Sequence, residues 1–227
     1  GFLFVYPHQI ITNLPDGVRQ RPATEYLSWE DAQTMHHRGV PVALISDVVR
    51  FLAAAQEGGV VIADEVQTGF GRTGTHFWAF EAQDVVPDIV VMGKPIGNGF
   101  PLGAVVCTRE IARSFDGVQY FNTNGGNPVA CAAGMAVLDI IEQDHLQNNA
   151  LVVSQIMMKG LHELKKKHSM IGDVRGVGLF LGIELVKDRE TKEPASKETA
   201  EVMERCRHFG LLVGKGGYLN NVIRMKP

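Results

Sequence analysis

Two stretches of this sequence pass through consecutive apolar or small residues and then reach one ionisable side chain. Val60–Ala63 leads to Asp64, and Ile89–Gly93 leads to Lys94. Both runs are continuous rather than alternating, which is typical of strands that are buried on both faces of a parallel sheet. Ligands of such sheets bind at the carboxyl ends of the strands. We therefore predict an α/β fold in which Asp64 and Lys94 lie at neighbouring strand ends and face one cavity.

A carboxylate and an amine in this arrangement suit the binding of an aldehyde cofactor. A lysine at the end of a buried strand is expected to be partly desolvated, which favours the neutral amine that forms an imine with a carbonyl. Pyridoxal 5′-phosphate needs such a lysine, and it needs an acid that keeps its ring nitrogen protonated. On the strand pattern alone, an alternative stays open in which Asp64 and Lys94 form a structural ion pair or meet solvent.

Three motifs decide between these interpretations. The segments ADEVQTGFGRTG, MGKPIGNGFPLGAVV and FNTNGGNP occur in this order. Together they resemble the core of the class III pyridoxal-phosphate aminotransferases, which have fold type I. The resemblance continues through GDVRGVGLFLGIELVKD and LLVGKGG to Arg224, and so covers the chain from about Val48 onward. Within the family it is strongest to the branch of alanine–glyoxylate aminotransferase 2, followed by the phospholyases acting on phosphoethanolamine and phosphohydroxylysine.

The resemblance assigns roles around the cofactor ring to four residues. It implies that Lys94 holds the cofactor as a Schiff base and acts as the catalytic base, while Asp64 pairs with the ring nitrogen. Val66 is expected to contact the ring from beneath, and Gln67 to hydrogen-bond the phenolic oxygen of the cofactor. Ordinary loop packing is the alternative for Val66 and Gln67.

Two further roles concern the phosphate and the substrate. The resemblance assigns Thr123 to the cofactor phosphate of the neighbouring subunit, which implies a homodimer with a shared active site. A helix-capping loop is a compatible interpretation of that segment. Arg224 corresponds to the arginine that binds the substrate carboxylate, for which a planar guanidinium is well suited. The implied substrates are a small amino acid and a 2-oxo acid, alanine and glyoxylate. Resemblance to this branch implies a mitochondrial location; without it, a cytoplasmic one is expected.

The resemblance also divides the chain into three parts. Residues 1–45 are atypical, residues 46–144 are expected to form a partial cofactor domain, and residues 145–227 a connecting helix and a small α/β domain. The family's glycine- and serine-rich phosphate loop and its stacking aromatic have no counterpart in residues 1–45. We therefore expect a fragment that lacks the N-terminal part and the extreme C-terminus, and that binds the cofactor weakly.

Periodicity and capping signals place the regular elements of these parts. We expect a strand over Leu102–Cys107 and a mostly extended segment over Met170–Val186. The expected helices cover Ser46–Gly58, Val129–Ile141, His145–His168 and, with Ser196 as its N-cap, Ser196–Gly210; a last strand starts at Leu211.

Composition excludes several other classes of function. The net charge is −3 and the largest basic cluster is Lys165–Lys167, which argues against nucleic acid as a partner. No apolar run approaches the roughly 18 residues of a membrane span. The three cysteines are scattered, which indicates neither a disulfide framework nor a metal site. His36 and His37 are adjacent and would point about 100° apart on a helix, so we expect no metal there either.

Three rival functions remain. A phospholyase would eliminate phosphate from phosphoethanolamine or phosphohydroxylysine with the same Lys94 and Asp64. A non-catalytic chain would keep the dimer surface without a complete cofactor site. Finally, GFGRTG at residues 69–74 matches the GxGxxG fingerprint of dinucleotide-binding domains, which predicts a helix that starts near Arg72. We interpret that segment as a loop, because it does not follow a strand directly.

Overall fold

A computed structural model describes residues 2–5, 19–22 and 59–227 of the chain. The chain divides into two compact units, residues 1–62 with 87–89 and residues 63–86 with 90–227, and each is considered by itself. In the first unit, strands β1 (Phe2–Val5) and β2 (Arg19–Pro22) pair in parallel, with Phe2 opposite Arg19. The helix predicted over Ser46–Gly58 lies outside the described residues.

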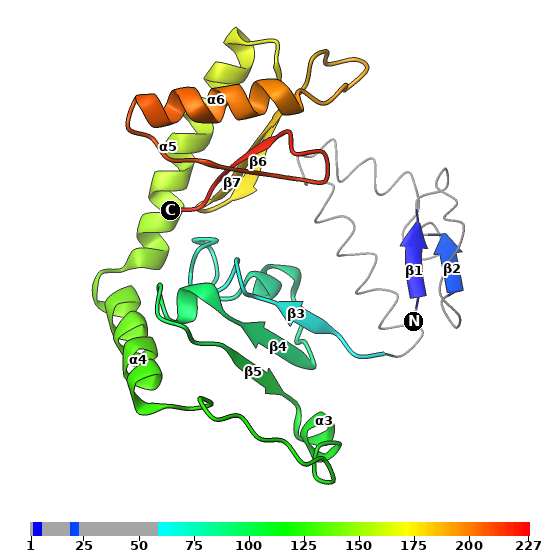
Figure 1. Cartoon of the computed structure of the whole chain (residues 1–227), viewed down its shortest axis with the longest axis vertical. Coiled ribbons are helices and arrows are strands. Elements are labelled where there is room, and N and C mark those ends of the chain that lie inside the picture. Colours follow the sequence, from blue (N-terminus) through cyan, green and yellow to red (C-terminus); the bar gives the residue numbers. More distant parts are fainter. Residues whose placement is uncertain (1, 6–18, 23–58) are drawn as a thin grey trace. The chain divides into compact units, whose positions relative to one another are not determined.

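A three-stranded sheet, in the order β3-β4-β5, carries the two ionisable residues (Figure 1). Strand β3 covers Ile62–Asp64, β4 covers Ile89–Met92 and β5 covers Ala104–Cys107. The Ile89 amide donates to the Val61 carbonyl over 3.1 Å, and further along the Glu65 amide donates to the Val91 carbonyl over 2.9 Å. Because residue numbers rise together along both strands, β3 and β4 are parallel, as predicted.

Strand β5 runs in the opposite direction. Gly103 precedes it directly, and a Cβ added there would lie 3.4 Å from the carbonyl oxygen of Met92, the last residue of β4. The start of β5 therefore lies beside the end of β4, as the arrows of Figure 1 also show. The link between them contains the short 3-10 helix η3 (Lys94–Ile96).

The strands of this sheet are not buried on both faces, so that prediction was wrong. Exposed fractions are 59% for Ile62, 64% for Val105 and 57% for Val106. A continuous apolar run implies layers of chain against both faces. Among the described residues, helix α4 (Pro128–Gln143) contacts η3, but no layers of chain cover both faces of this sheet.

The connecting helices follow the predicted pattern. Helix α4 starts after Asn127, whose side chain accepts a hydrogen bond from the Ala130 amide over 2.9 Å. Helix α5 (Leu146–Lys167) follows after His145, which has a φ of 52°. The predicted boundary at residue 144 falls at this break, and the one at residue 45 lies outside the described residues; both stay predictions.

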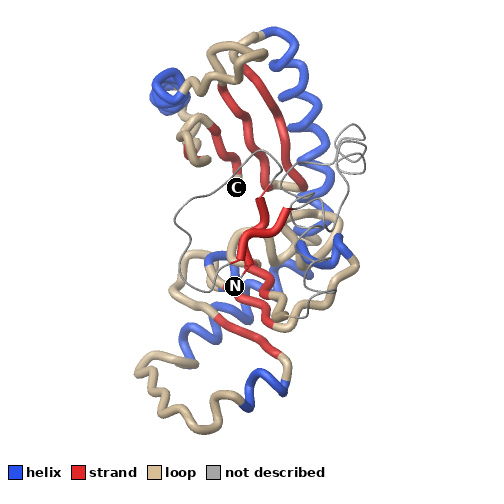
Figure 2. Tube along the Cα trace, turned by 90° about the vertical axis from the view of Figure 1, so that its right-hand side faces the viewer, coloured by secondary structure: helices blue, strands red, loops and turns tan. Residues whose placement is uncertain are grey.

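The C-terminal part is an antiparallel sheet in the order β6-β7-β9-β8. Its strands are β6 (Ile171–Val177), β7 (Phe180–Leu185), β8 (Gly214–Gly216) and β9 (Val222–Met225). Figure 2 shows α5 running along this sheet, and α6 (Ser196–His208) contacts the other strands. The core cluster consists of Leu161, Ile171, Val174, Leu181, Ile183, Leu185, Ala195 and Ile223.

Three details differ from the sequence-based expectations. Met170–Val186 forms a hairpin, β6 and β7, because Gly178 adopts a φ of +54° and lets the chain reverse. Ser196 is not the N-cap of α6, which is Ala195; the Ser196 hydroxyl donates to the Leu219 carbonyl instead. The last strands begin at Gly214 and Val222 rather than at Leu211.

Candidate active site

Asp64 and Lys94 lie at the same edge of the three-stranded sheet. Asp64 is the last residue of β3, and Lys94 follows β4 after one glycine. Since β3 and β4 are parallel neighbours, both side chains start from carboxyl ends of adjacent strands. The Asp64 carboxylate accepts a hydrogen bond from the Val66 amide over 3.1 Å, which fixes the start of the following loop.

The backbone at Lys94 is strained. Its φ is +39°, in the left-handed region that costs an ordinary residue roughly 1–2 kcal/mol. Pro95 follows at once, and the Gly97 amide donates to the Lys94 carbonyl over 3.3 Å. Gly97 itself allows no side chain, since an added Cβ would lie 2.0 Å from the Phe100 carbonyl oxygen. Strain of this kind at a lysine is a feature that clusters at functional sites.

Lys94 is exposed, as is Asp64, so the expectation of a partly desolvated amine was wrong for this structure. Desolvation requires chain on the open side of the strand ends. The described residues around Lys94 do not cover that side, and Ile62 in β3 is exposed as well.

Val66 and Gln67 lie in the loop that follows β3. An added Cβ on Gly93 would be 3.4 Å from Val66 Cγ1, so Val66 packs beside the backbone that leads to Lys94. The Gln67 side-chain oxygen accepts a hydrogen bond from the Lys226 ammonium. The structure thus brings the end of the chain to a residue that was predicted to contact the cofactor.

Sequence reasoning missed Glu65, which organises this loop. Its exposed fraction is 2%, and its two carboxylate oxygens accept hydrogen bonds from the Phe80 amide, over 2.9 Å, and the Thr68 hydroxyl, over 2.8 Å. A buried carboxylate with donors on both oxygens ties the two ends of the loop together. The only signal for it in the sequence was its place directly after Asp64.

Lys226, which contacts Gln67 in the loop after β3, has cationic neighbours. Burial lowers the pKa of Lys226, and the charges of Arg224, Lys94 and Arg72 lower it further. Burial also lowers the pKa of Arg72. Such a group of like charges is stabilised when an anion binds among them. A phosphorylated cofactor or a carboxylate substrate fits this donor set.

Arg224 and Thr123, the remaining predicted site residues, occupy different elements. Arg224 belongs to β9, and its guanidinium donates to the Lys215 carbonyl over 2.8 Å while it covers Gly216. Thr123 lies in the exposed turn ahead of α4. No hydrogen bond in the described part of the chain joins Thr123 to Lys94, and its role toward a neighbouring subunit stays a prediction.

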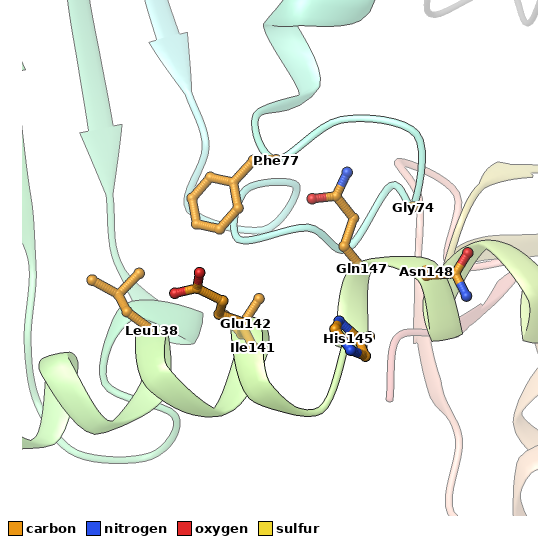
Figure 3. A pocket seen from close by; sticks show the side chains of 8 residues that line it. All are labelled: Gly74, Phe77, Leu138, Ile141, Glu142, His145, Gln147 and Asn148. Carbon is orange, nitrogen blue, oxygen red and sulfur yellow. The ribbon is translucent and has the colours of Figure 1, made fainter.

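A separate open cavity of about 600 Å³ lies between the loop after β3 and the junction of α4 and α5 (Figure 3). Neither Asp64 nor Lys94 lines it, so a cavity shared by those two residues stays a prediction. Its lining residues are Gly74, Phe77, Leu138, Ile141, Glu142, His145, Gln147 and Asn148.

The described residues bear on three other features of the sequence. They contain no group of three or more histidine, cysteine or acidic side chains placed to hold a metal ion; His36 and His37 lie outside them. None of the helices in the described ranges has the length and apolar character to cross a membrane. The GFGRTG segment forms a turn with Phe70 and Gly71 at positive φ, and no helix starts near Arg72, which rules out the dinucleotide fingerprint.

Comparison with known proteins adds independent evidence. The family model described as aminotransferase class-III matches residues 44–227. Alanine–glyoxylate aminotransferase 2 homolog 2, mitochondrial, of Arabidopsis thaliana is 56% identical over 182 residues, which are 78% of this chain and 38% of that protein. Mitochondrial alanine–glyoxylate aminotransferase 2 of Homo sapiens is 51% identical over 172 residues, 75% of this chain and 34% of that protein. The chain therefore spans well under half the length of these relatives.

Solved structures of aminotransferases and of a phospholyase also resemble the fold of this chain. An aminotransferase of Bacillus anthracis is 37% identical with a TM-score of 0.73, over 81% of this chain and 43% of that one. A phospholyase from Arthrobacter in complex with phosphoethanolamine is 32% identical with a TM-score of 0.75, over 96% and 60%. An amine transaminase from an uncultivated Pseudomonas species in its PLP-bound form is 27% identical with a TM-score of 0.76, over 97% and 59%.

Proposed function

Because the chain belongs to the class III aminotransferase family, we propose that it carries the catalytic lysine and acid of a pyridoxal-phosphate enzyme that transfers the amino group of alanine to glyoxylate. The observation that carries this proposal is the position of Asp64 and Lys94 at carboxyl ends of neighbouring parallel strands. The products would be pyruvate and glycine.

The residues around these strand ends fit the cofactor. When bound, pyridoxal phosphate supplies an electron sink next to the substrate Cα. Lys94 would hold it covalently, Asp64 would keep a proton on its ring nitrogen, and Val66 and Gln67 would contact the ring and its phenolic oxygen. The fit rests on the apolar contact of Val66 beside Gly93 and on the cationic side chains, which would bind an anionic group such as the cofactor phosphate.

Each protein group has a defined task in the reaction. The Lys94 Nζ would carry the proton between the substrate Cα and the cofactor C4′, which is general base and acid catalysis by one amine. The Asp64 carboxylate would favour a protonated ring nitrogen, since a nearby negative charge stabilises the positive form. Arg224 would bind the substrate carboxylate, for which its guanidinium must leave the Lys215 carbonyl or share a donor with it.

Partners and location follow from the relatives' names and from the resemblance. We propose a homodimer in which Thr123 serves the cofactor phosphate of the neighbouring subunit. We also propose a mitochondrial location, since the Arabidopsis and human relatives are named mitochondrial.

The first test is the absorption of the purified chain during titration with pyridoxal phosphate up to millimolar concentration, followed by borohydride reduction and peptide mapping. We expect the reduced adduct on Lys94 and its loss in Lys94→Ala. Lys159→Ala, an exposed lysine of α5, is the matched control and should keep the adduct. An adduct spread over surface lysines, unchanged in Lys94→Ala, would contradict the proposal.

The second test identifies the reaction. Pyruvate formation from alanine and glyoxylate is expected, and Asp64→Ala should lower it far more than Lys159→Ala does. Phosphate release from phosphoethanolamine without pyruvate formation would replace the transaminase by a phospholyase, the activity named for the Arthrobacter structure. An adduct on Lys94 without either product would indicate a non-catalytic chain.

A further inference from the structure

The last residues of the chain are held against the loop that follows β3. The Lys226 ammonium donates to the Gln67 side-chain oxygen, and the Arg72 guanidinium donates to the Pro227 carbonyl. The carbonyl of Arg72 in turn accepts from the Leu179 amide over 2.9 Å. These three hydrogen bonds join the loop to the C-terminal sheet on the side of the strand ends.

Two further contacts fix where the Lys226 ammonium lies. Met225, the preceding residue, is paired with Leu181 in the sheet, so the backbone before Lys226 is held by β7. The ammonium also lies 5.9 Å from the centre of the Phe180 ring, an attractive distance for a cation over an aromatic face. Lys226 is thus placed by the sheet rather than by the loop that it contacts.

The chemistry of this contact determines the orientation of the Gln67 carboxamide. A lysine ammonium has three donors and no acceptor, so it can bind only the amide oxygen. With the oxygen engaged by Lys226, the NH2 group of Gln67 points elsewhere and presents two donors. No hydrogen bond joins that NH2 group to another side chain in the described part of the chain.

We propose that Lys226 is a positioning residue that fixes the Gln67 carboxamide with its NH2 group directed at the phenolic oxygen of the cofactor. This inference rests on the proposed function, and it concerns the same site. Without Lys226, the amide could rotate by half a turn and present its oxygen to an anionic oxygen, which is repulsive. Lys226 therefore acts through Gln67 and need not touch the cofactor.

The surrounding charges support an anionic partner for this amide. Arg224, Lys94 and Arg72 all lie close enough to act on Lys226, and none of them offers an acceptor. In such an environment a bound anion gains from every cation, and a correctly oriented neutral amide adds a directional donor. The substitution Lys226→Met removes both the hydrogen bond that orients the Gln67 carboxamide and one of the four positive charges.

A double-mutant cycle separates these two effects. The cofactor Kd is measured by absorbance titration of the unaltered chain, Lys226→Met, Gln67→Leu and the double variant. We expect each single variant to weaken binding by about 10-fold or more, the scale of one hydrogen bond involving a charged group. The double variant should be weaker than Gln67→Leu only by the effect of the lost charge, and so clearly less than the product of the two single effects. Lys226→Arg should restore most of the affinity, while Lys192→Met is the control for a lysine outside the contact. Independent, multiplicative effects of the two single variants would overturn the inference.

A cofactor-free measurement keeps this test separate from that of the proposed function. In a 1H–15N spectrum of the chain without cofactor, the side-chain NH2 pair assigned by Gln67→Leu should shift in Lys226→Met and not in Lys192→Met. An unmoved pair would overturn the inference even if the cofactor binds. If the unaltered chain binds no cofactor, the proposed function fails, and this shift alone decides whether Lys226 positions the amide.

Discussion

Gly178 joins the C-terminal hairpin to the loop that carries the predicted cofactor contacts, and its substitution by alanine is the sharpest test of that junction. The residue has a φ of +54° at the turn between β6 and β7. A Cβ added there would lie 2.3 Å from the Arg72 carbonyl oxygen and 2.4 Å from the Thr73 carbonyl carbon. Both atoms belong to the backbone, so the hairpin and the loop must move apart.

The cost of Gly178→Ala has two parts. A left-handed backbone costs alanine roughly 1–2 kcal/mol relative to glycine. Separation of the two segments also breaks the hydrogen bond from the Leu179 amide to the Arg72 carbonyl, which contributes about 0.5–1.5 kcal/mol. We therefore expect Gly178→Ala to lower the free energy of unfolding by about 2–3 kcal/mol.

Gly126→Ala is the matched control for this prediction. Gly126 has a similar φ of +66°, but an added Cβ would meet no atom within 4 Å. Gly126→Ala should therefore lower the free energy of unfolding by the cost of the left-handed backbone alone, roughly 1–2 kcal/mol. Urea unfolding followed by circular dichroism measures both variants, and at an m-value of about 1–3 kcal/mol per molar the Gly178→Ala midpoint should fall by roughly 1 M. Equal losses in the two variants would show that the junction contributes nothing.

Three further predictions concern single contacts. Asn127→Ala should destabilise the chain by about 1 kcal/mol, because the Ala130 amide loses its cap, and urea unfolding will show this. Leu161→Ala should cost about 2–5 kcal/mol, since Leu161 belongs to the buried core of the C-terminal part; a loss below 1 kcal/mol would contradict that core. Burial raises the pKa of Asp173, but the Arg175 hydrogen bond and the nearby positive charges outweigh it and hold that pKa below its ordinary value of 3.8. The stability from this carboxylate is present above that value and is lost as pH falls through the lower folded pKa, so Asp173→Asn should flatten the acid side of the pH–stability curve.

Local patterns in the sequence determined the elements that position the predicted catalytic pair. Continuous apolar runs that end in Asp64 and Lys94 predicted two parallel strands, and the structure confirms that they are parallel neighbours. The helix predicted over Val129–Ile141 corresponds to α4, and the capping interpretation of the segment before it is met by the Asn127 side chain. These features depend on residues close together in the chain, whose spacing reports backbone geometry directly. The roles of Lys94, Asp64, Val66, Gln67, Thr123 and Arg224 stay predictions.

The sequence did not predict which parts of the sheet would be exposed, because burial depends on what packs against a strand rather than on the strand itself. Ile62 and Lys94 illustrate this point. The hairpin of β6 and β7 was missed for a related reason. A run of apolar residues with several glycines fits one long strand as well as two short ones until the φ of Gly178 is known.

Only the tertiary structure brought Lys226 to Gln67 and the Pro227 carbonyl to Arg72. These partners are 159 and 155 residues apart in the sequence. No local spacing encodes such contacts, since they depend on the register of β9 against β7 and on where the turn at Gly178 meets the loop. The sequence by itself therefore determined which residues stand at the strand ends, and the folded chain decided that Lys226 and Pro227 contact the loop after β3, because groups distant in sequence become neighbours only through the contacts of that loop with the C-terminal sheet.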